Sequence, residues 1–504
     1  MNDMNGMNEM NERHTSPAAA QDENEWLCAP ASALPDDIAR LKAAGYLKEA
    51  AARIDARLAE DWAQSQNGGA QSPAANPAPH GVDAQRAALL AAREVLRRLP
   101  ADYPYTEEAA VARMQGLVRG FTAEELRALE RAGRVDWRFI EGEKRYFARF
   151  DETLLDTDPA FAARRLAPGP DADARRARRR ALHDRMARTG QAAARITLEA
   201  SIRMSDDAFA AALARARQEG RQAVHLRVWL PLPAACPAQS GIRLEWASEP
   251  PARVAPETAP QRTVCWEADL AENRAFAVRY SYTRTARYAD PMGFAPDPVQ
   301  PAFDTGEQAP HILFTPALRA LAAQLTAGVS SPAEKARRFY DYITLNVRYH
   351  YQPAYFVLED IPTRCAADRR GDCGVMALTF ITLCRLAGIP ARWESGLAAG
   401  PDSCGCHDWA AFYIAPKGWM YADCSYGAAM ARAGDEELRR HYFGSLDPDR
   451  MAANTAFGAP FDPPMRAFRA DPWDNQTGEM EADGVGLWGD ETLTDKRTIS
   501  YQEL

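Results

Sequence analysis

One stretch constrains the fold of this chain more than any other: residues 373–387, which read CGVMALTFITLCRLA. Its single charge is Arg385, and its apolar residues leave no polar face. A helix of this kind is buried on nearly all sides. Gly388 and Pro390 are expected to end it. The chain must therefore supply a core large enough to surround a central helix.

Length and composition allow such a core. The 504 residues predict two to four domains. Hydrophobic residues make up 46% and charged residues 26%, as in ordinary globular proteins. The net charge of −9 at pH 7 argues against a general nucleic-acid binder. We therefore expect no nucleic-acid partner.

The N-terminal residues 1–33 are polar and repetitive, without the basic start and apolar core of a secretory signal. No run approaches the roughly 20 apolar residues of a membrane span. We expect a disordered tail, no membrane partner and a cytoplasmic location. The nine cysteines are then expected to be free thiols, metal ligands or catalytic groups.

Hydrophobic periodicity divides the rest of the chain and predicts an α+β fold class. Helical spacing predominates up to about residue 192, and alternating strand patterns with Pro-rich joints follow. The predicted units are a helical hairpin (34–63), a linker (64–81), a helical domain (82–192), a β-sandwich-like domain (193–300), a mixed core (301–450) and an extended C-terminal wrap (451–504). The basic run 174–188 favours a solvated helix with acidic neighbours over an RNA-binding site, because the whole chain is acidic.

Cys373 is the candidate reactive residue. It stands in the first turn of the apolar helix, where unpaired N–H groups and the helix dipole favour a thiolate. Gly371 and Gly374 keep bulk away from the sulfur, while Asp372 is expected to cap the helix. The alternative interpretation is a buried structural thiol.

A nucleophilic cysteine needs a base and an orienting group. The histidines near the motif are His311, His350, His407 and His441. His407 opens the strand-like segment 407–414, and Asp423 closes the next one across a short turn. A hairpin would place both side chains on neighbouring strands, although a one-residue slip would turn either to the other face. Asp408 is expected to be an exposed strand residue.

Several motifs follow one another along the chain: Gly-Asp-Cys-Gly, an apolar helix, Gly-Ile-Pro-Ala-Arg, His-x-Trp, Gly-Trp and Asp. In this order they resemble the transglutaminase-like superfamily over about residues 331–427. The resemblance implies a papain-like fold, with a central helix packed on an antiparallel sheet. It implies Cys373 as nucleophile, His407 as general base and acid, and Asp423 as orienter. The strands with VWLPLP resemble the β domain that often precedes this core in bacterial members. The oxyanion donor stays open among Tyr349, Asn346 and Gln352.

The function that the resemblance implies is thiol acyl transfer at amide bonds of a peptide or protein substrate, with no cofactor. If water accepts the acyl group, the protein is a cysteine peptidase or amidase, and we favour this alternative. If a lysine amine accepts the acyl group, the protein is a transglutaminase. Two alternatives remain. One is a non-catalytic binding or scaffold protein on the same fold. The other is a zinc site at Cys404, Cys406 and His407, completed by Cys365 or Cys424. The oligomeric state stays open.

Overall fold

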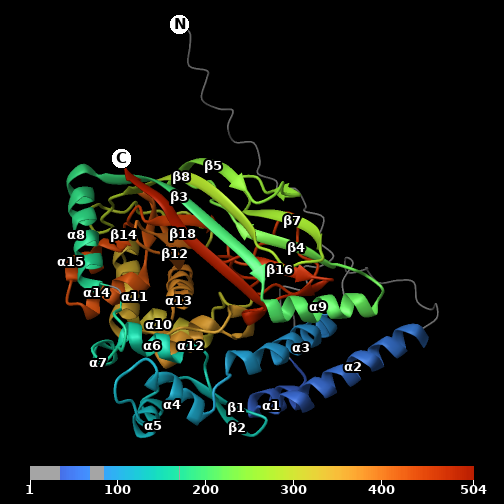
Figure 1. Cartoon of the computed structure of the whole chain (residues 1–504). Coiled ribbons are helices and arrows are strands. Elements are labelled where there is room, and N and C mark those ends of the chain that lie inside the picture. The colour runs from blue at the N-terminus through green and yellow to red at the C-terminus, as the bar shows by residue number, and fades with distance from the viewer. Residues whose placement is uncertain (1–33, 68–83, 170) are drawn as a thin grey trace, which may run out of the picture.

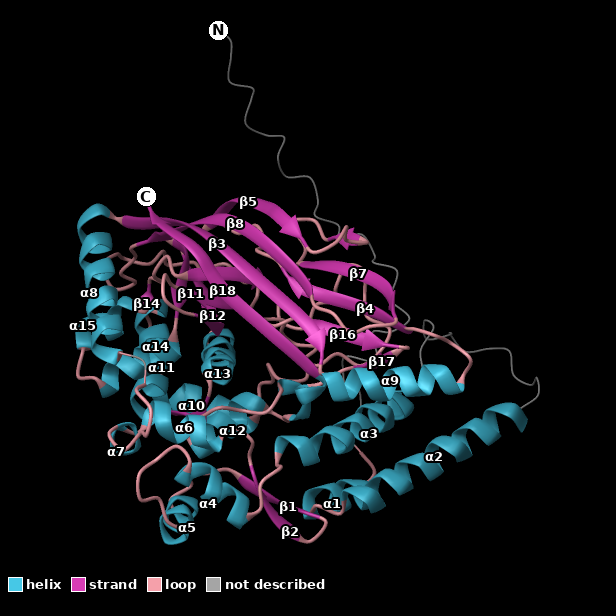
Figure 2. Ribbon diagram, viewed as in Figure 1, coloured by secondary structure: helices cyan, strands magenta, loops and turns pink. Residues whose placement is uncertain are grey.

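The computed structural model describes residues 34–67, 84–169 and 171–504. The predicted tail and most of the predicted linker lie outside the described residues. The helices between residues 36 and 162 lie along one side of the molecule, the long strands lie along the other, and helix α13 (Cys373–Leu386) stands between them (Figures 1 and 2).

The N-terminal part is helical, as its periodicity predicts, with one short hairpin added. The hairpin pairs β1 (Trp137–Ile140) with β2 (Glu143–Tyr146) around Gly142, whose φ is +80°. The helices are α1 (Asp36–Ala44), α2 (Leu47–Asn67), α3 (Ala84–Asp102), α4 (Glu107–Gln115), α5 (Ala123–Arg131), α6 (Phe150–Thr157), α7 (Pro159–Ala162) and α8 (Ala172–Thr189).

Helix α8 carries the basic run, and its arginines have acidic partners elsewhere in the fold. Arg178 pairs with Asp449, and Arg180 pairs with Asp435 and Glu437. These partners belong to the region after the central helix. The ion pairs therefore join α8 to the core, in line with the interpretation of a helix with acidic neighbours.

Two antiparallel sheets enclose a second core. Their orders are β17-β16-β4-β7-β6 and β18-β3-β8-β5. The segment predicted to wrap over the core thus supplies strands to both sheets, and β18 pairs with β3 along nearly its whole length. The elements are β3 (Gln191–Met204), α9 (Asp206–Gln218), β4 (Val224–Pro231), β5 (Gln239–Ala247), β6 (Arg253–Val254), β7 (Thr263–Leu270), β8 (Phe276–Arg287), β16 (Glu479–Ala482), β17 (Val485–Gly486), the 3-10 helix η3 (Gly489–Glu491) and β18 (Thr492–Glu503).

The remaining region packs helices on a sheet of order β14-β13-β12-β11-β15. Phe380 of α13 meets Phe412 of β12 edge to face, with ring centroids 5.6 Å apart. The α+β prediction of a central helix on an antiparallel sheet is confirmed. The elements are α10 (Pro316–Leu325), α11 (Pro332–Asn346), β9 (Arg348–Tyr349), the 3-10 helix η2 (Tyr355–Val357), α12 (Ile361–Asp368), β10 (Arg370–Gly371), α13 (Cys373–Leu386), β11 (Ala391–Ala399), β12 (Cys404–Ile414), β13 (Gly418–Ala422), α14 (Cys424–Arg432), α15 (Glu436–His441), β14 (Phe443–Gly444) and β15 (Arg450–Asn454).

Helix α13 is buried from Gly374 to Cys384. The two threonines in this buried stretch form hydrogen bonds within the helix, since Thr379 donates to the carbonyl of Val375 and Thr382 to that of Leu378. Each large apolar side chain buried here contributes about 1.5–3 kcal/mol. The helix is therefore a firmly packed support for its first residue.

No helix among the described residues is long and apolar enough to cross a bilayer.

Candidate active site

Cys373 is the first residue of α13. Asp372 caps the helix, as expected, by accepting a hydrogen bond from the amide of Val375 at 3.1 Å. The hydroxyl of Tyr355 donates to the same carboxylate at 2.6 Å. A Cβ on Gly374 would collide with the Tyr355 hydroxyl and with Asp408. The helix start is thus packed so closely that only glycine fits beside the thiol.

His407 and Asp423 form a buried pair. His407 Nε2 lies 2.7 Å from Asp423 Oδ2, which leaves Nδ1 as the other ring nitrogen. The Asp423 carboxylate also accepts from the amide of Tyr426 at 2.9 Å and pairs with Arg450 at 2.9 Å. The β12–β13 hairpin therefore brings together two of the three predicted site residues.

The thiol of Cys373 has a different partner. Its Sγ donates to Asp408 Oδ2 at 3.1 Å, and not to His407. Asp408 is 5% exposed, so the expectation of an exposed strand residue was wrong. Successive strand residues point to opposite sides, and the side chain at 408 extends toward the start of α13. Sequence reasoning missed this residue, although its place beside His407 was the available signal.

Burial raises the pKa of the Cys373 thiol well above its ordinary value, and the charges of Asp408 and Asp372 raise it further. The pKa of Asp408 is also well above the ordinary range, through burial and then the nearby Asp474 and Asp372. Burial and like charges therefore outweigh the helix dipole, which favours a thiolate. At neutral pH the structure holds Cys373 as a protonated thiol.

The C-terminal segment reaches this site between η2 and β12. Gln476 donates to the carboxylate of Asp408 and to the carbonyl of His407. Asp474 accepts from Ser395 and from Asn454, while Asp471 accepts from the amide of Tyr355 at 3.0 Å. Burial raises the pKa of Asp474 to about 6 and that of Asp471 to about 7. Several carboxyl groups therefore surround the thiol.

The three candidate oxyanion donors differ in their surroundings. The amide of Asn346 donates to the carbonyl of Tyr342, and that of Gln352 to the carbonyl of His350. Tyr349 pairs with Gly371 in the parallel β9–β10 bridge. Its pKa is raised by burial and then by the charges of Cys373 and Asp372. Tyr349 is thus the candidate that lies near Cys373.

Among the described residues, Cys404, Cys406 and His407 are not a group whose possible ligand atoms converge as a metal site requires. Cys406 accepts from Lys496 Nζ at 2.8 Å, and His407 is held by Asp423. Within the described parts of the chain, the group whose possible ligand atoms converge is His183, Asp184 and Glu437. Since Glu437 already pairs with Arg180, that group has a structural explanation.

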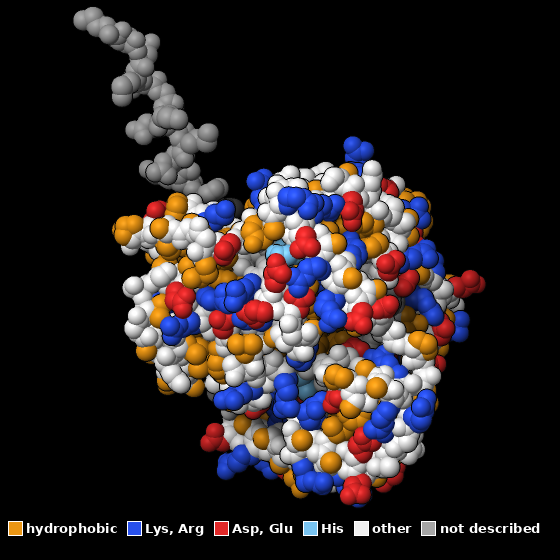
Figure 3. Space-filling model, turned by 90° about the vertical axis from the view of Figure 1, so that its left-hand side faces the viewer, with side chains coloured by type: hydrophobic (Ala, Val, Ile, Leu, Met, Phe, Trp, Pro, Cys, Tyr) orange, Lys and Arg blue, Asp and Glu red, His pale blue; other side chains and the backbone are white. Residues whose placement is uncertain are grey.

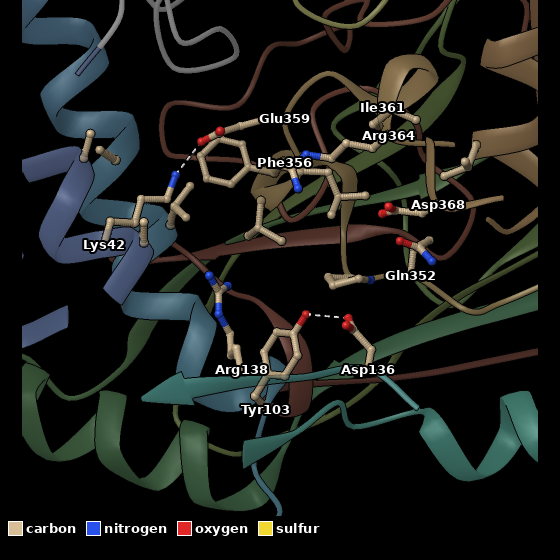
Figure 4. Close-up of a pocket in the computed structure, with 18 of the residues that line it drawn as sticks. Lys42, Tyr103, Asp136, Arg138, Gln352, Phe356, Glu359, Ile361, Arg364 and Asp368 are labelled. Atoms are coloured by element: carbon tan, nitrogen blue, oxygen red, sulfur yellow. Dashed lines mark hydrogen bonds and ion pairs between the residues drawn. The ribbon is translucent and has the colours of Figure 1, made fainter. Parts of the chain in front are cut away.

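A cavity of about 740 Å³ lies where the N-terminal helices meet the core, and not at the thiol. Arg138 and Arg364 approach it from opposite walls, and the Lys42–Glu359 ion pair closes one end (Figure 4). Val375, in the first turn of α13, belongs to its lining. The cavity therefore reaches helix α13 at Val375, and its lining does not include Cys373.

The family model of the transglutaminase-like superfamily matches residues 319–424. Residues 319–424 are a transglutaminase-like superfamily domain. This domain contains Cys373, His407 and Asp423, and it leaves the N-terminal helices and the paired β sheets outside the match. No curated protein matches the chain.

Solved structures with a similar arrangement are distant in sequence. A protein from Cytophaga hutchinsonii, named as a putative cysteine protease, is 15% identical over 62% of this chain and 91% of its own, with a TM-score of 0.38. The periplasmic domain of TgpA from Pseudomonas aeruginosa is 16% identical over 52% of this chain and 96% of its own, with a TM-score of 0.24. A protein from Parabacteroides distasonis, named as a putative protease, is 15% identical over 47% of this chain and 60% of its own, with a TM-score of 0.19.

Proposed function

We propose that this protein is a cysteine-dependent acyl-transfer enzyme that hydrolyses amide bonds of peptides or proteins, with Cys373 as nucleophile. The observation that carries the proposal is the position of Cys373 at the start of a helix that is buried from Gly374 to Cys384, inside the transglutaminase-like domain. A packed support of this kind holds a reacting atom in a fixed geometry, which is where much of enzymatic rate enhancement comes from.

In the proposed reaction the thiol loses its proton and its sulfur attacks the amide carbonyl carbon. The resemblance assigns the proton to His407 Nδ1, with Nε2 held by Asp423. The thiol must then exchange its hydrogen bond from Asp408 to the imidazole. This exchange requires a rearrangement at the start of β12, because residues 407 and 408 point to opposite sides of the strand. His407 next gives the proton to the departing amine, so that the C–N bond breaks and a thioester remains. Water attacks the thioester, gives one proton to His407, and releases the acid as the thiol is restored.

The test is turnover of a peptide library by the full chain, with and without an added primary amine. We expect hydrolysis products, no dominant amine adducts, and a loss of turnover by a factor of about 10⁴ in Cys373→Ala. Cys406→Ala is the matched control, because that thiol is exposed, and it should keep wild-type turnover.

Each other outcome identifies an alternative. Dominant amine adducts would indicate a transglutaminase. Turnover that survives in Cys373→Ala would contradict the nucleophile assignment. Absence of any turnover in the wild type would favour the binding or scaffold function on the same fold.

A further inference from the structure

A second cavity, of about 250 Å³, lies beside the strands that lead into the nucleophile. One wall is formed by Arg348, Tyr349 and His350, together with Arg370 and with Arg432 at the end of α14. The opposite wall comes from the N-terminal unit and consists of Gly133, Arg134, Thr153, Thr157, Asp158 and Pro159. Figure 3, which faces this side of the molecule, shows a hollow bordered by Lys and Arg side chains with a histidine visible inside it.

The lining carries more positive charge than its acidic partners neutralise. Arg134 pairs with Asp158 at 3.0 Å, and Arg370 pairs with Asp136 at 3.3 Å. Arg348 and Arg432 have no ion pair or side-chain hydrogen bond to any residue that the structure describes. Burial, followed by the charges of Arg134 and Arg370, lowers the pKa of Arg348. An anion in the cavity would relieve this repulsion between like charges.

His350 provides an independent sign that a ligand belongs here. It is 4% exposed, and its Nε2 has no hydrogen-bond partner among the described residues. Its Nδ1 lies 2.8 Å from the carbonyl of Tyr351, which assigns the proton of the neutral ring to Nδ1. Nε2 becomes an N–H donor when the ring takes a second proton, and an anion beside it would favour that proton. A buried polar atom without a partner is costly, so a bound group would complete it.

The cavity lies close to Cys373 because residues of β9 and β10, the strands that lead to this thiol, form part of its lining. The backbones of Arg370 and Gly371 in β10 pair with those of Arg348 and Tyr349 in β9. Cys373 follows Gly371 by two residues. Arg432 ends the helix whose N-cap is Asp423. At about 3.3 Å per extended residue, a substrate side chain in the cavity would stand roughly two to three residues from the scissile amide.

We propose that this cavity binds a carboxylate of the peptide substrate, through Arg348 and Arg432 at its mouth and His350 at its base. The inference rests on the proposed function and specifies its substrate class: peptides with an acidic residue, or a free C-terminus, two to three residues from the cleaved bond. Arginine matches the planar, two-oxygen geometry of a carboxylate. The small volume suits one side chain or one chain end, since pockets for larger ligands usually exceed about 300 Å³.

The test measures peptide binding to full-length Cys373→Ala by fluorescence anisotropy, so that it does not depend on turnover. Acetylated and amidated peptide pools with one fixed Glu are compared with matched pools that carry Gln. We expect the Glu pools to bind about tenfold more tightly. Adding Arg348→Gln and Arg432→Gln should remove the difference. Arg243→Gln, an exposed arginine of β5, is the matched control and should keep it.

Two further arms distinguish the sources of the anion. Peptide pools with a free C-terminus are compared with amidated pools, which distinguishes binding of a chain-end carboxylate from binding of a side-chain carboxylate. Tighter binding of peptides with either kind of carboxylate supports the proposal. Inorganic phosphate is the third probe, because binding of phosphate without binding of either carboxylate would overturn it. Equal affinity of Glu and Gln pools, with no gain from a free C-terminus, or a difference that survives the double arginine substitution, would also overturn it. Since Cys373 is absent from these proteins, such a failure is separate from a failure of the nucleophile assignment.

Discussion

Asp408 and Asp423 are both buried beside the β12–β13 hairpin, yet their pKa values move in opposite directions. Burial alone would raise the pKa of Asp423, but the charges of His407 and Arg450 hold it below its ordinary value. Asp408 has no ion pair with a cation among the residues that the structure describes, and its pKa rises through burial and the nearby carboxyl groups. Since both carboxyl groups are buried, the neighbouring charges account for the opposite directions of the two pKa shifts.

The difference divides the site into two halves with different chemistry. The His407 half is a neutralised network of imidazole, carboxylate and guanidinium groups. The Cys373 half contains several buried carboxyl groups with raised pKa values, and these groups disfavour a thiolate. The proposed function requires a thiolate at Cys373, and it therefore requires this second half to change when a substrate binds. The predictions below test each half separately.

The largest effect is expected from Arg450→Met. Arg450 is fully buried and pairs with Asp423 at 2.9 Å and with Asp447 at 3.3 Å. Its removal leaves two buried carboxylates without their cation, which should lower the free energy of unfolding by about 3–5 kcal/mol. Urea unfolding at pH 7 measures this loss. Arg243→Met is the control at an exposed site, where the change should stay within about 0.5 kcal/mol. A loss below about 1 kcal/mol in Arg450→Met would show that the network is not held by this arginine.

A tenfold effect is expected from Asp408→Asn. Removing this carboxylate takes away one cause of the raised thiol pKa. A decrease of one pKa unit increases the thiolate fraction about tenfold. The rate of alkylation of Cys373 by iodoacetamide at pH 7, followed by mass spectrometry, should rise accordingly.

The control is Asp402→Asn, which changes an exposed carboxylate before β12 and should leave the alkylation rate of Cys373 unchanged. A slower rate in Asp408→Asn would contradict the prediction, because it would mean that Asp408 takes the thiol proton instead of retaining it.

A third prediction concerns the pH dependence of stability. The pKa values of Asp474, about 6, and Asp471, about 7, lie above the value of about 3.9 for an unfolded chain. The folded state therefore binds more protons between these values, and stability contributed by these groups falls as pH rises from about 4 to about 7. Asp423 acts in the opposite direction, since its lowered pKa adds stability above about pH 4 that is lost as pH falls.

Urea unfolding at a series of pH values separates the two contributions. The double variant Asp471→Asn/Asp474→Asn should lose less stability than the wild type between about pH 4 and about pH 7. An unchanged slope over this range would argue that the two carboxyl groups are not protonated in the folded protein.

Much of the architecture could be predicted from sequence because its signals are local. The apolar run after Cys373, its Gly-Ile-Pro stop and the Asp372 cap act within a few residues, and the structure has them as predicted. The β1–β2 hairpin was missed because its four-residue strands lie among strong helix formers. The assignment of Cys373, His407 and Asp423 as a triad stays a prediction, as do the domain boundaries, the substrate and the cytoplasmic location.

The sequence by itself determined where the buried helix lies and which thiol starts it. It also determined that a histidine follows on one strand and an aspartate at the end of the next. Only the tertiary structure decided that Asp408 contacts the thiol, because strand residues alternate sides and register depends on distant partners. It also decided that Asp474 and Gln476, far along the chain, close around Asp408. The arginine cavity has the same origin, since its walls come from the N-terminal unit, β9, β10 and α14, and no local pattern encodes their meeting.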